Sequence, residues 1–522
     1  MIRGIIDRDI ARMEESIRAL KSRRNELSPI SRLPVEILCD IFSFTQAEDL
    51  ARRPESWISF SQVSQHWRSS ALCAPALWTN IPIHNPHWAQ EMLIRSKEAK
   101  LTIRADLSLR GVNQLSNTIK TVRSCLYEMN RVEEIDVDII AISGSILEEI
   151  FRHVPKSAPQ LHTLCLASRF YHGPVFSIHE DFLYNTDRLQ RVKLINCEIS
   201  WDSRLLTGLT HLFLQNSLKA NSSMIEFFHA IQQMPALTDL QLEDSIPDDL
   251  DGPSTYPVVD LSCLRRLHIS SGVGPLTTVL RHITFPHTAK LNLTCRENQS
   301  IQIDFSNFLS VLATKFLSSL VIRSLSLRFG LESLQFYLYT TAFIQDCCPL
   351  PFHSQLQLVL RWPSTQPRNH VKALTDAFDA MSLPFLTQLQ ISTGHSIDSQ
   401  TLAETFGQLP LLERVCVKGN ASMILEALVY KTKAAEKSKT AYRTVSFPKL
   451  CYFHLDCISF SGDTMLYDML LDCLMERCER SAEIQVLRLS DCYNLLSHHV
   501  KGLEEIVVDV IWDGIEQIDA DF

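Results

Sequence analysis

One spacing of apolar residues recurs along most of this chain and constrains its fold more than any other feature. An apolar residue is followed three positions later by a second, and two positions after that by a third. The clearest copies begin at Leu161, Leu189, Leu209, Leu237 and Leu264, with later ones at Leu386, Leu412, Ile484 and Leu503 and an early one at Val132. Because side chains alternate between the two faces of a strand, each copy predicts a short strand with one apolar face.

The copies lie roughly 20 to 30 residues apart, a spacing that resembles leucine-rich repeats, in which a short parallel strand is followed by a returning helix or loop. One such unit cannot bury its apolar face alone, so stacked units form a solenoid with continuous internal ladders. Apolar residues at helical spacing between the copies predict helices at 145–154, 224–234, 371–381, 424–436 and 465–477. We therefore expect an α/β region of parallel strands with returning helices from 84 to 522.

Two details refine this expectation. The pattern is irregular from about 285 to 367, which predicts atypical repeats or an insertion there. A small or polar residue follows three positions after the last ladder residue of several copies, and in the turn it can satisfy a backbone group. These residues are Cys197, Ser217, Ser245, Asn420 and Cys492.

Composition narrows the functional classes. The chain has 522 residues, of which 45% are hydrophobic, and this is enough to fold without metal or disulfide staples. The formal net charge of -9 argues against nucleic-acid binding. The 15 cysteines fit small buried hydrophobes in a reducing compartment. Charged residues near the N-terminus and the lack of a membrane-spanning apolar run lead us to expect a cytoplasmic or nuclear protein, or both, with no membrane partner.

Motifs for catalysis, nucleotide binding or metal binding are absent from the sequence, and we expect no catalytic residue, cofactor or metal. His498-His499 and the Cys473/Cys478 pair do not form a recurrent ligand spacing, so a structural role is the favoured interpretation. A catalytic triad assembled only by the fold would escape this search.

The first 28 residues predict an amphipathic helix. Ile6, Ile10, Met13, Ile17, Leu20 and Leu27 follow alternating steps of four and three, with Arg24 as one charged interruption. This is the a/d seam of a short coiled coil, which is weak at three heptads. The helix either packs back on its own chain or dimerises, and Ser28-Pro29 is expected to end it.

Residues 29–83 predict a small helical module. A helix begins after Leu33-Pro34, and its residues Ile37, Leu38, Ile41 and Phe42 share one face. A second helix is expected from about 57 to 72, and Pro75 with Leu77-Trp78 closes the unit.

The amino-acid sequence of this module resembles the F-box of the expanded fungal F-box families. The resemblance rests on Arg24-Asn25, Ser28-Pro29-Ile30-Ser31-Arg32, Leu33-Pro34-Val35-Glu36-Ile37-Leu38, Val63-Ser64-Gln65-His66-Trp67-Arg68 and Ala71-Leu72-Cys73-Ala74-Pro75-Ala76-Leu77-Trp78. It implies binding to a Skp-type adaptor of a ubiquitin ligase. It also implies that eight residues form the apolar faces of the module, some inserting into the adaptor and others forming the core: Leu33, Pro34, Ile37, Leu38, Ile41, Phe42, Val63 and Trp67.

The function that the resemblance implies is non-catalytic. An F-box protein of this kind is the substrate-recognition subunit of an SCF-type cullin E3 ubiquitin ligase, and its repeats bind a target protein for ubiquitin-dependent degradation. Side chains between the ladder residues point to the concave face of such a solenoid, and we expect them to contact the target. They are Arg191, Lys193, His211, Phe213, Asp239, Gln241, Arg266, His268, Arg414, Lys418 and Arg488. The alternatives are an interaction scaffold without a role in ubiquitylation and, more remotely, an enzyme acting on a small molecule.

Overall fold

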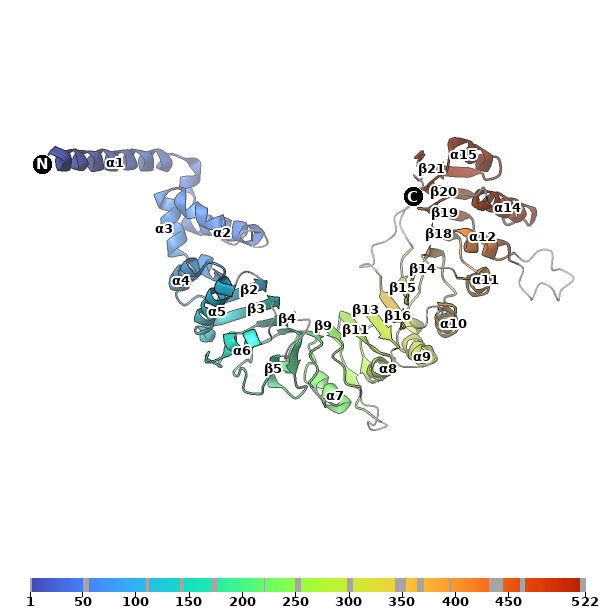
Figure 1. Ribbon diagram of the computed structural model, residues 1–522, viewed down its shortest axis with the longest axis horizontal. Helices are drawn as coiled ribbons and strands as arrows, with labels where there is room; N and C mark the ends of the chain where they lie inside the picture. The colour runs from blue at the N-terminus through green and yellow to red at the C-terminus, as the bar shows by residue number, and fades with distance from the viewer. Residues whose placement is uncertain are drawn as a thin grey trace. The chain divides into compact units, whose positions relative to one another are not determined.

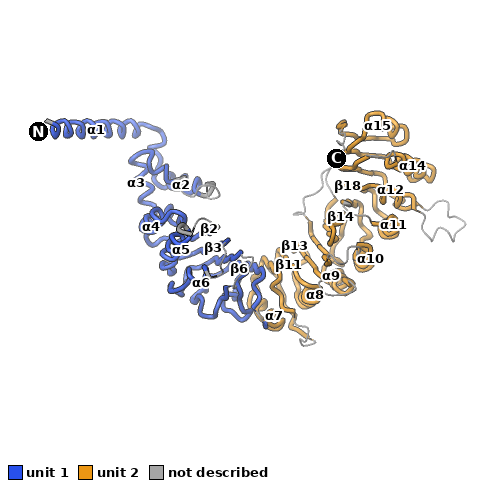
Figure 2. The backbone as a smooth tube through the Cα atoms, viewed as in Figure 1, with its two compact units in different colours: residues 1–221 blue, residues 222–522 orange. Residues whose placement is uncertain are grey.

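The computed structural model describes residues 2–49, 56–108, 112–140, 145–169, 176–219, 221–248, 255–297, 304–342, 354–363, 370–393, 397–430, 445–460 and 465–516. The chain forms two compact units, residues 1–221 and residues 222–522 (Figure 2). The fold is mixed α/β: helices come first, and strands in a predominantly parallel arrangement with helices between them follow (Figure 1).

The N-terminal helices of the first unit contain the module predicted from sequence. They are α1 (Ile2–Glu26), the 3-10 helix η1 (Pro29–Arg32), α2 (Val35–Asp49), η2 (Ser56–Gln62), α3 (Gln65–Cys73) and η3 (Pro75–Trp78). Helix α1 ends before Ser28-Pro29 and α2 begins after Pro34, as expected.

The prediction of one continuous helix from 57 to 72 was wrong. Ser64 has an extended backbone, and its side chain accepts a hydrogen bond from the Trp67 amide. This N-cap starts α3 anew and separates it from η2. At the far end, the Trp78 ring is fully buried and its Nε1 donates to the Ala71 carbonyl at 2.8 Å, which closes the module.

The remainder of the first unit is a parallel sheet. Its strands pair in the order β1 (Asn80–Pro82), β2 (Leu101–Ser108), β3 (Val132–Ile140), β4 (Thr163–Ser168), β6 (Arg191–Ile195) and β8 (His211–Gln215). Helices α4 (Pro86–Arg95), α5 (Val112–Leu126) and α6 (Ser145–Phe151) lie along one side of it (Figure 1). Strands β5 (Phe176–Ile178) and β7 (Cys197–Ile199) form a separate parallel pair.

The second unit begins with α7 (Met224–Gln232) and continues the strand–helix alternation. Its main sheet has the order β9 (Asp239–Glu243), β11 (Arg266–Gly272), β13 (Lys290–Arg296), β16 (Leu356–Arg361), β15 (Ser333–Tyr339), β14 (Ser324–Gly330), β17 (Gln388–Thr393), β18 (Arg414–Gly419), β19 (Tyr452–Asp456), β20 (Val486–Ser490) and β21 (Asp509–Trp512). The short strands β10 (Val259–Asp260) and β12 (Ile283–Thr284) pair separately.

Helices of this unit cover one side of its sheet (Figure 1). They are α8 (Val273–His282), α9 (Ser306–Lys315), α10 (His370–Ala380), α11 (Ser399–Phe406), α12 (Ser422–Val429), α14 (Met465–Glu479) and α15 (Ser497–Glu504). The helices predicted at 145–154, 224–234, 371–381 and 465–477 are confirmed within a few residues, as is the first part of the one at 424–436; residues 431–436 of that prediction lie outside the described residues.

Equivalent apolar residues of successive copies stand side by side across the strands. Leu164, Val192 and Leu212 are register partners in the first unit, and Leu240, Leu267 and Leu291 are partners in the second. All six side chains are buried. The predicted apolar ladders are therefore present in both units.

The irregular middle region is an antiparallel insertion. Strand β14 turns back into β15 through a tight hairpin in which Gly330 and Ser333 are partners, and β16 then lies between β15 and β13. One antiparallel strand thus interrupts an otherwise parallel sheet, because a two-residue turn cannot join parallel strands.

The last predicted copy was misplaced. Leu503 lies in α15 and Val508 is exposed, whereas the partners of Leu487 and Leu489 in β21 are Val510 and Trp512. The ladder of the final strand therefore starts at the buried Val507, four residues later than predicted. A copy starting at Leu450 in front of β19, which the pattern search missed, has Phe453 and Leu455 in the same ladders.

Candidate protein-interaction surfaces

An aromatic cluster holds the N-terminal module together. Phe42 of α2 is fully buried, with its ring 5.3 Å from that of Trp67 on α3 and 6.0 Å from that of Phe60 on η2. Leu38, one helical turn before Phe42, is also fully buried. These contacts fix α2 against α3 and form the module's own core.

The structure divides the eight residues assigned to adaptor binding. Leu38 and Phe42 are both fully buried, which places them among the core residues of the division that the sequence left open and not among the exposed candidates for adaptor contact. Leu33 and Trp67 are half-buried and Pro34 is exposed. Ile37, Ile41 and Val63 are exposed, at 45%, 40% and 56%.

A stripe of exposed apolar residues runs along α2 beside this core. Ile37, Ile41 and Phe44 are spaced i, i+4 and i+7, so they lie on one helix face, and Pro34 precedes them on the same face. Phe44 is 68% exposed and was missed in the sequence analysis, although its spacing from Ile37 could have identified it. We call these four residues the α2 stripe. Apolar side chains aligned in this way on a small module form a surface suited to a protein partner.

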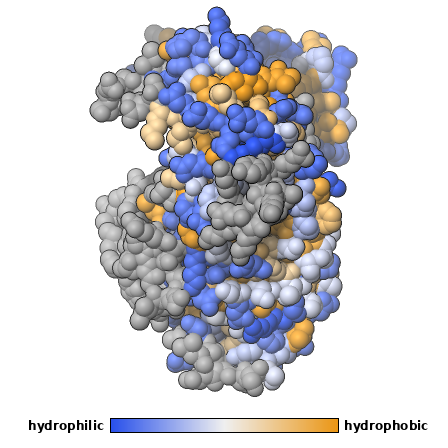
Figure 3. Space-filling view, turned by 90° about the vertical axis from the view of Figure 1, so that its right-hand side faces the viewer, coloured by the Kyte–Doolittle hydropathy of each residue, from blue (hydrophilic) through white to orange (hydrophobic). Residues whose placement is uncertain are grey.

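Exposed apolar side chains also occur elsewhere. Met465 and Met475 on α14, and Val508 before β21, are more than half exposed. On the side of the molecule in Figure 3, hydrophobic residues gather in the upper part among hydrophilic ones. Exposure alone does not identify a binding site. The α2 stripe differs from these scattered residues because its members are regularly spaced along one helix face.

In each unit, the side chains between the ladder residues form a further candidate surface, on the sheet side that helices leave open (Figure 1). In the first unit, Arg191 is the register partner of His211 and Lys193 that of Phe213. The Lys193 ammonium lies 5.5 Å from the centre of the Phe213 ring, within cation–π range. Both basic residues are exposed, and His211 and Phe213 are half-buried.

In the second unit, four of the predicted residues line one groove of about 230 Å³. Arg266, His268 and Gln241 reach solvent in part, but Asp239 is only 4% exposed and is an error in the predicted exposed set. Its carboxylate forms an ion pair with Arg266 and accepts a hydrogen bond from Gln241 at 3.0 Å. These two neighbours cover Asp239, which therefore orients them and is not itself available to a partner.

The sequence analysis missed the other residues of this groove. Its other polar lining residues are Lys290, Asn292, Ser354 and Gln357, and the ladder residues Leu267 and Leu291 also contribute. Lys290 and Asn292 belong to β13, and Gln357 belongs to β16. They lie in the region where the repeat pattern is irregular, so spacing could not assign them to this side of the sheet.

Near the C-terminus, the predicted residues are tied to neighbouring strands. Lys418 Nζ lies 3.1 Å from a carboxylate oxygen of Asp456, and this hydrogen bond raises the pKa of Lys418. The Arg414 guanidinium lies 4.6 Å from the centre of the Tyr452 ring. Arg488 is the register partner of His454 and is half-buried. The result is a row of oriented polar groups with both charge signs.

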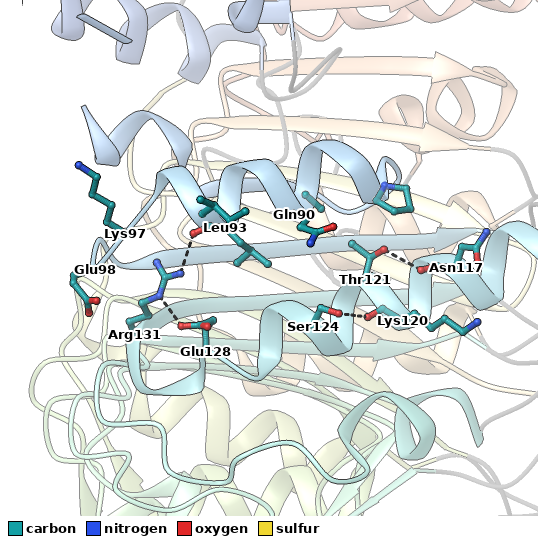
Figure 4. A pocket seen from close by; sticks show the side chains of 13 residues that line it. Gln90, Leu93, Lys97, Glu98, Asn117, Lys120, Thr121, Ser124, Glu128 and Arg131 are labelled. Carbon is teal, nitrogen blue, oxygen red and sulfur yellow. Dashed lines mark hydrogen bonds and ion pairs between the residues drawn. The ribbon is translucent and has the colours of Figure 1, made fainter. Parts of the chain in front are cut away.

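A groove of about 880 Å³ between α4 and α5 is the main candidate for a small-molecule site. Figure 4 shows Arg131 turned toward Leu93 and Glu128 in this groove. The guanidinium donates to the Leu93 carbonyl at 3.4 Å, to the Ala99 carbonyl at 2.9 Å and to Glu128 at 3.1 Å. Arg131 therefore anchors the end of α4 and is already occupied by these partners.

The described residues include several buried cysteines and one cluster of possible metal ligands. Burial raises the pKa of Cys197, Cys473 and Cys492 to about 12, which keeps these thiols protonated and unreactive at neutral pH. Asp456, Cys457 and Asp491 come close together, but Asp456 is bound to Lys418. The ring centroids of His498 and His499 lie 4.0 Å apart with the rings tilted, and Tyr467 donates to the His499 carbonyl.

Residues 30–84 match a protein-family model described as F-box-like. The match spans the helices that carry the α2 stripe and the aromatic cluster. It supports an F-box protein and implies binding to a Skp-type adaptor and a non-catalytic role. Comparison with curated proteins finds no match. Among the helices in the described part of the chain, none has the length and apolarity needed to cross a membrane.

Proposed function

We propose that the chain is the substrate-recognition subunit of an SCF-type cullin ubiquitin ligase. The observation that carries this proposal is the α2 stripe, which lies within the F-box-like match and leaves Ile37, Ile41 and Phe44 exposed. An apolar anchor at the centre of a protein interface typically contributes ~2 kcal/mol or more. Three such side chains on one helix face can form the centre of an adaptor interface.

We further propose that residues 84–522 form a leucine-rich-repeat solenoid of the fungal F-box type and bind the target. The ladders of register-matched apolar residues support the repeat assignment. The open side of the strands supports the target assignment, because it presents Arg191, Lys193 and Arg266 beside acidic and aromatic neighbours. A surface with both charge signs fits a protein more than a polyanion.

In this role the chain supplies proximity. A target held on the repeats is brought close to a ubiquitin-charged enzyme that the cullin recruits, so the effective concentration of its lysines rises. No residue of this chain then has to take part in the chemistry. We place this activity in the cytoplasm, the nucleus or both, and its outcome is degradation of the target.

Co-purification with the Skp-type adaptor tests the α2 stripe directly. We expect the wild-type chain to retain the adaptor and the double variant Ile37→Asp/Ile41→Asp to lose it, because charged groups in an apolar interface are not solvated. Ile94→Asp on α4 is the matched control: Ile94 is 65% exposed but lies outside the module, so binding should be unchanged. If the double variant still binds the adaptor, the α2 stripe is not the adaptor-binding surface.

Protein turnover separates the ligase receptor from a scaffold that binds the adaptor without ubiquitylation. The full-length chain and the Ile37→Asp/Ile41→Asp variant are expressed in the same cells, and proteins bound to both are identified. For a receptor, at least one shared partner has a longer half-life with the variant. Equal half-lives for every shared partner would favour the scaffold.

A further inference from the structure

The apolar stripe of α1 has no partner in the described residues. Its members are Ile6, Ile10, Met13, Ile17 and Leu20, with exposed fractions from 47% at Ile10 to 67% at Leu20. The helix is 25 residues long, and its stripe is not covered by the described residues of its own chain, which was one of the two alternatives left open by the sequence. A helix of this length with an uncovered stripe is marginal in water and is stabilised when the stripe is covered.

The heptad positions of α1 show what can cover it. With Ile10 and Ile17 at a and Ile6, Met13 and Leu20 at d, the e positions are Asp7, Glu14 and Lys21, and the g positions are Asp9, Ser16 and Arg23. Charges at e and g flank the seam, and they set the orientation of a partner helix.

A parallel pair of these helices is unfavourable. Asp9, at a g position, would face Glu14, at an e position of the second copy, and this contact between like charges would occur twice. Arg24, which occupies an a position, would also face its own copy inside the seam. Two guanidinium groups in one apolar layer repel each other and cannot both remain well solvated.

An antiparallel pair centred at residue 15 reverses these contacts. Asp7 at one e position then faces Lys21, and Asp9 at one g position faces Arg23, each contact occurring twice by symmetry. Glu14 faces its own copy at the centre, which is the one repulsive flanking contact. Four attractive contacts thus stand against one repulsive contact.

The seam also fits better in this orientation. Ile10 meets Leu20 and Met13 meets Ile17, so four central layers are fully apolar. Arg24 faces the aliphatic Ile6 near the end of the pair, where its stem can cover the isoleucine while the guanidinium reaches water. Both the flanks and the seam select the same alignment.

We propose that α1 pairs with α1 of a second copy of this chain in an antiparallel coiled coil, making the protein a homodimer. The occupant of the stripe is therefore the same helix, and its charge pattern is self-complementary. This inference is independent of the proposed ligase role, because it concerns a different helix from the α2 stripe.

Sedimentation equilibrium of the full-length chain tests the proposal. We expect a concentration-dependent species of about twice the mass of one chain. Lys21→Asp turns two attractive contacts into repulsive ones and should raise the dimer dissociation constant about tenfold. Asp7→Lys should have a similar effect. The double variant Asp7→Lys/Lys21→Asp restores both contacts with exchanged charges, and its dissociation constant should return close to that of the wild type.

Arg18→Asp is the matched control, because Arg18 lies at a b position on the same helix and outside the interface. It makes the same change of charge and should leave the dissociation constant unchanged. Rescue by the double variant is specific to the antiparallel pair, since in a parallel pair Asp7 and Lys21 face Ile2 and Ser16.

Three results would overturn the proposal. The first is a monomer at all concentrations. The second is a dimer that persists when residues 1–28 are deleted, which would place the contact elsewhere. The third is a double variant that dimerises no better than the single variants, which would exclude the antiparallel alignment.

Discussion

Arg477 is a fully buried arginine on α14 whose guanidinium is held by backbone carbonyls. Nη1 donates to Leu428 at 3.1 Å and to Ser446 at 2.9 Å, and Nη2 donates to Phe447 at 3.0 Å. Leu428 lies in α12, whereas Ser446 and Phe447 precede β19. One side chain therefore connects three consecutive parts of the repeat array.

Replacement of this guanidinium should strongly destabilise the second unit. Arg477→Met removes a donor from three buried carbonyls, of which Phe447 keeps the Leu450 amide, and we expect the free energy of unfolding to fall by about 3 kcal/mol or more. Urea unfolding followed by circular dichroism measures this loss. Arg480→Met, directly after the same helix, is the control: Arg480 pairs with the partly exposed Glu476 and makes one carbonyl contact, to Val429 at 3.4 Å, so the loss should be about 1 kcal/mol or less. Equal losses would contradict the role of the carbonyl contacts.

A second residue-scale prediction concerns Asp136 on β3. Burial raises the pKa of Asp136, and the negative charge of Glu134 raises it further. The folded state therefore takes up the proton at a higher pH than the unfolded chain, so the ionised form costs stability at neutral pH and this cost disappears as the pH falls toward 4. Asp136→Asn should accordingly raise the melting temperature at pH 7 and reduce the difference between pH 7 and pH 4.

Asp138→Asn provides the comparison on the same strand. The Asp138 carboxylate accepts hydrogen bonds from Arg169 Nε at 3.1 Å and from Arg169 Nη2 at 2.8 Å. Removing its charge breaks a paired contact, so the melting temperature at pH 7 should fall slightly or stay unchanged. A lower melting temperature for Asp136→Asn than for Asp138→Asn would refute the argument.

At the element scale, the turn after each strand is set by backbone conformation as well as by the apolar ladder. Asn196, Asn216, Asp244 and Asp491 follow their strands with positive φ angles between 48° and 51°. In the next position, Cys197, Ser217 and Cys492 donate to the carbonyl of the last ladder residue of a preceding strand, at 3.2 to 3.7 Å. This confirms the prediction that these side chains satisfy backbone groups, and Asn420 does so by accepting from the Ser422 amide.

The positive φ of 48° at Asn216 makes this turn testable. A β-branched residue is disfavoured in this conformation, so Asn216→Val should lower the free energy of unfolding by about 1–2 kcal/mol. Asn216→Gly, which adopts the conformation without strain, should change it by much less. Thermal unfolding of both variants compares them, and similar losses would mean that the side chain matters more than the backbone angle.

Ladder residues were predicted well from the sequence, whereas the last repeat and one exposed residue were not. The recurring spacing of apolar residues correctly predicted ladder residues such as Leu164 and Leu240, because only a strand with one buried face explains that spacing. The same spacing placed the last copy at Leu503, because Leu503, Ile506 and Val508 satisfy the pattern by chance while α15 extends over the first of them. The position of Asp239 between ladder residues predicts an exposed side chain. Its burial is explained only by the neighbouring Arg266 and Gln241, which cover it.

At the scale of the whole molecule, two separate apolar stripes lie on α1 and α2, and we propose a different partner for each. The sequence could predict both helices from their periodicity. It could not separate Leu38 and Phe42 from Ile37 and Ile41, because all four share one broad face of α2, and only packing against Phe60 and Trp67 decides which of them remain exposed. The α1 stripe and the α2 stripe have no residue in common, and residues 27–34 separate the two helices.

Because the two surfaces are separate, their variants should act independently. Mutations at distant sites without shared partners are usually additive. Lys21→Asp should weaken self-association while the adaptor still co-purifies, and Ile37→Asp/Ile41→Asp should abolish adaptor binding while the dimer dissociation constant stays within about twofold of the wild type. Light scattering of the purified complex then gives two chains with two adaptors for the wild type, and one of each for Lys21→Asp at concentrations below its raised dissociation constant. Loss of both activities in either variant would mean that the stripes form one continuous surface and that adaptor and second copy compete for it.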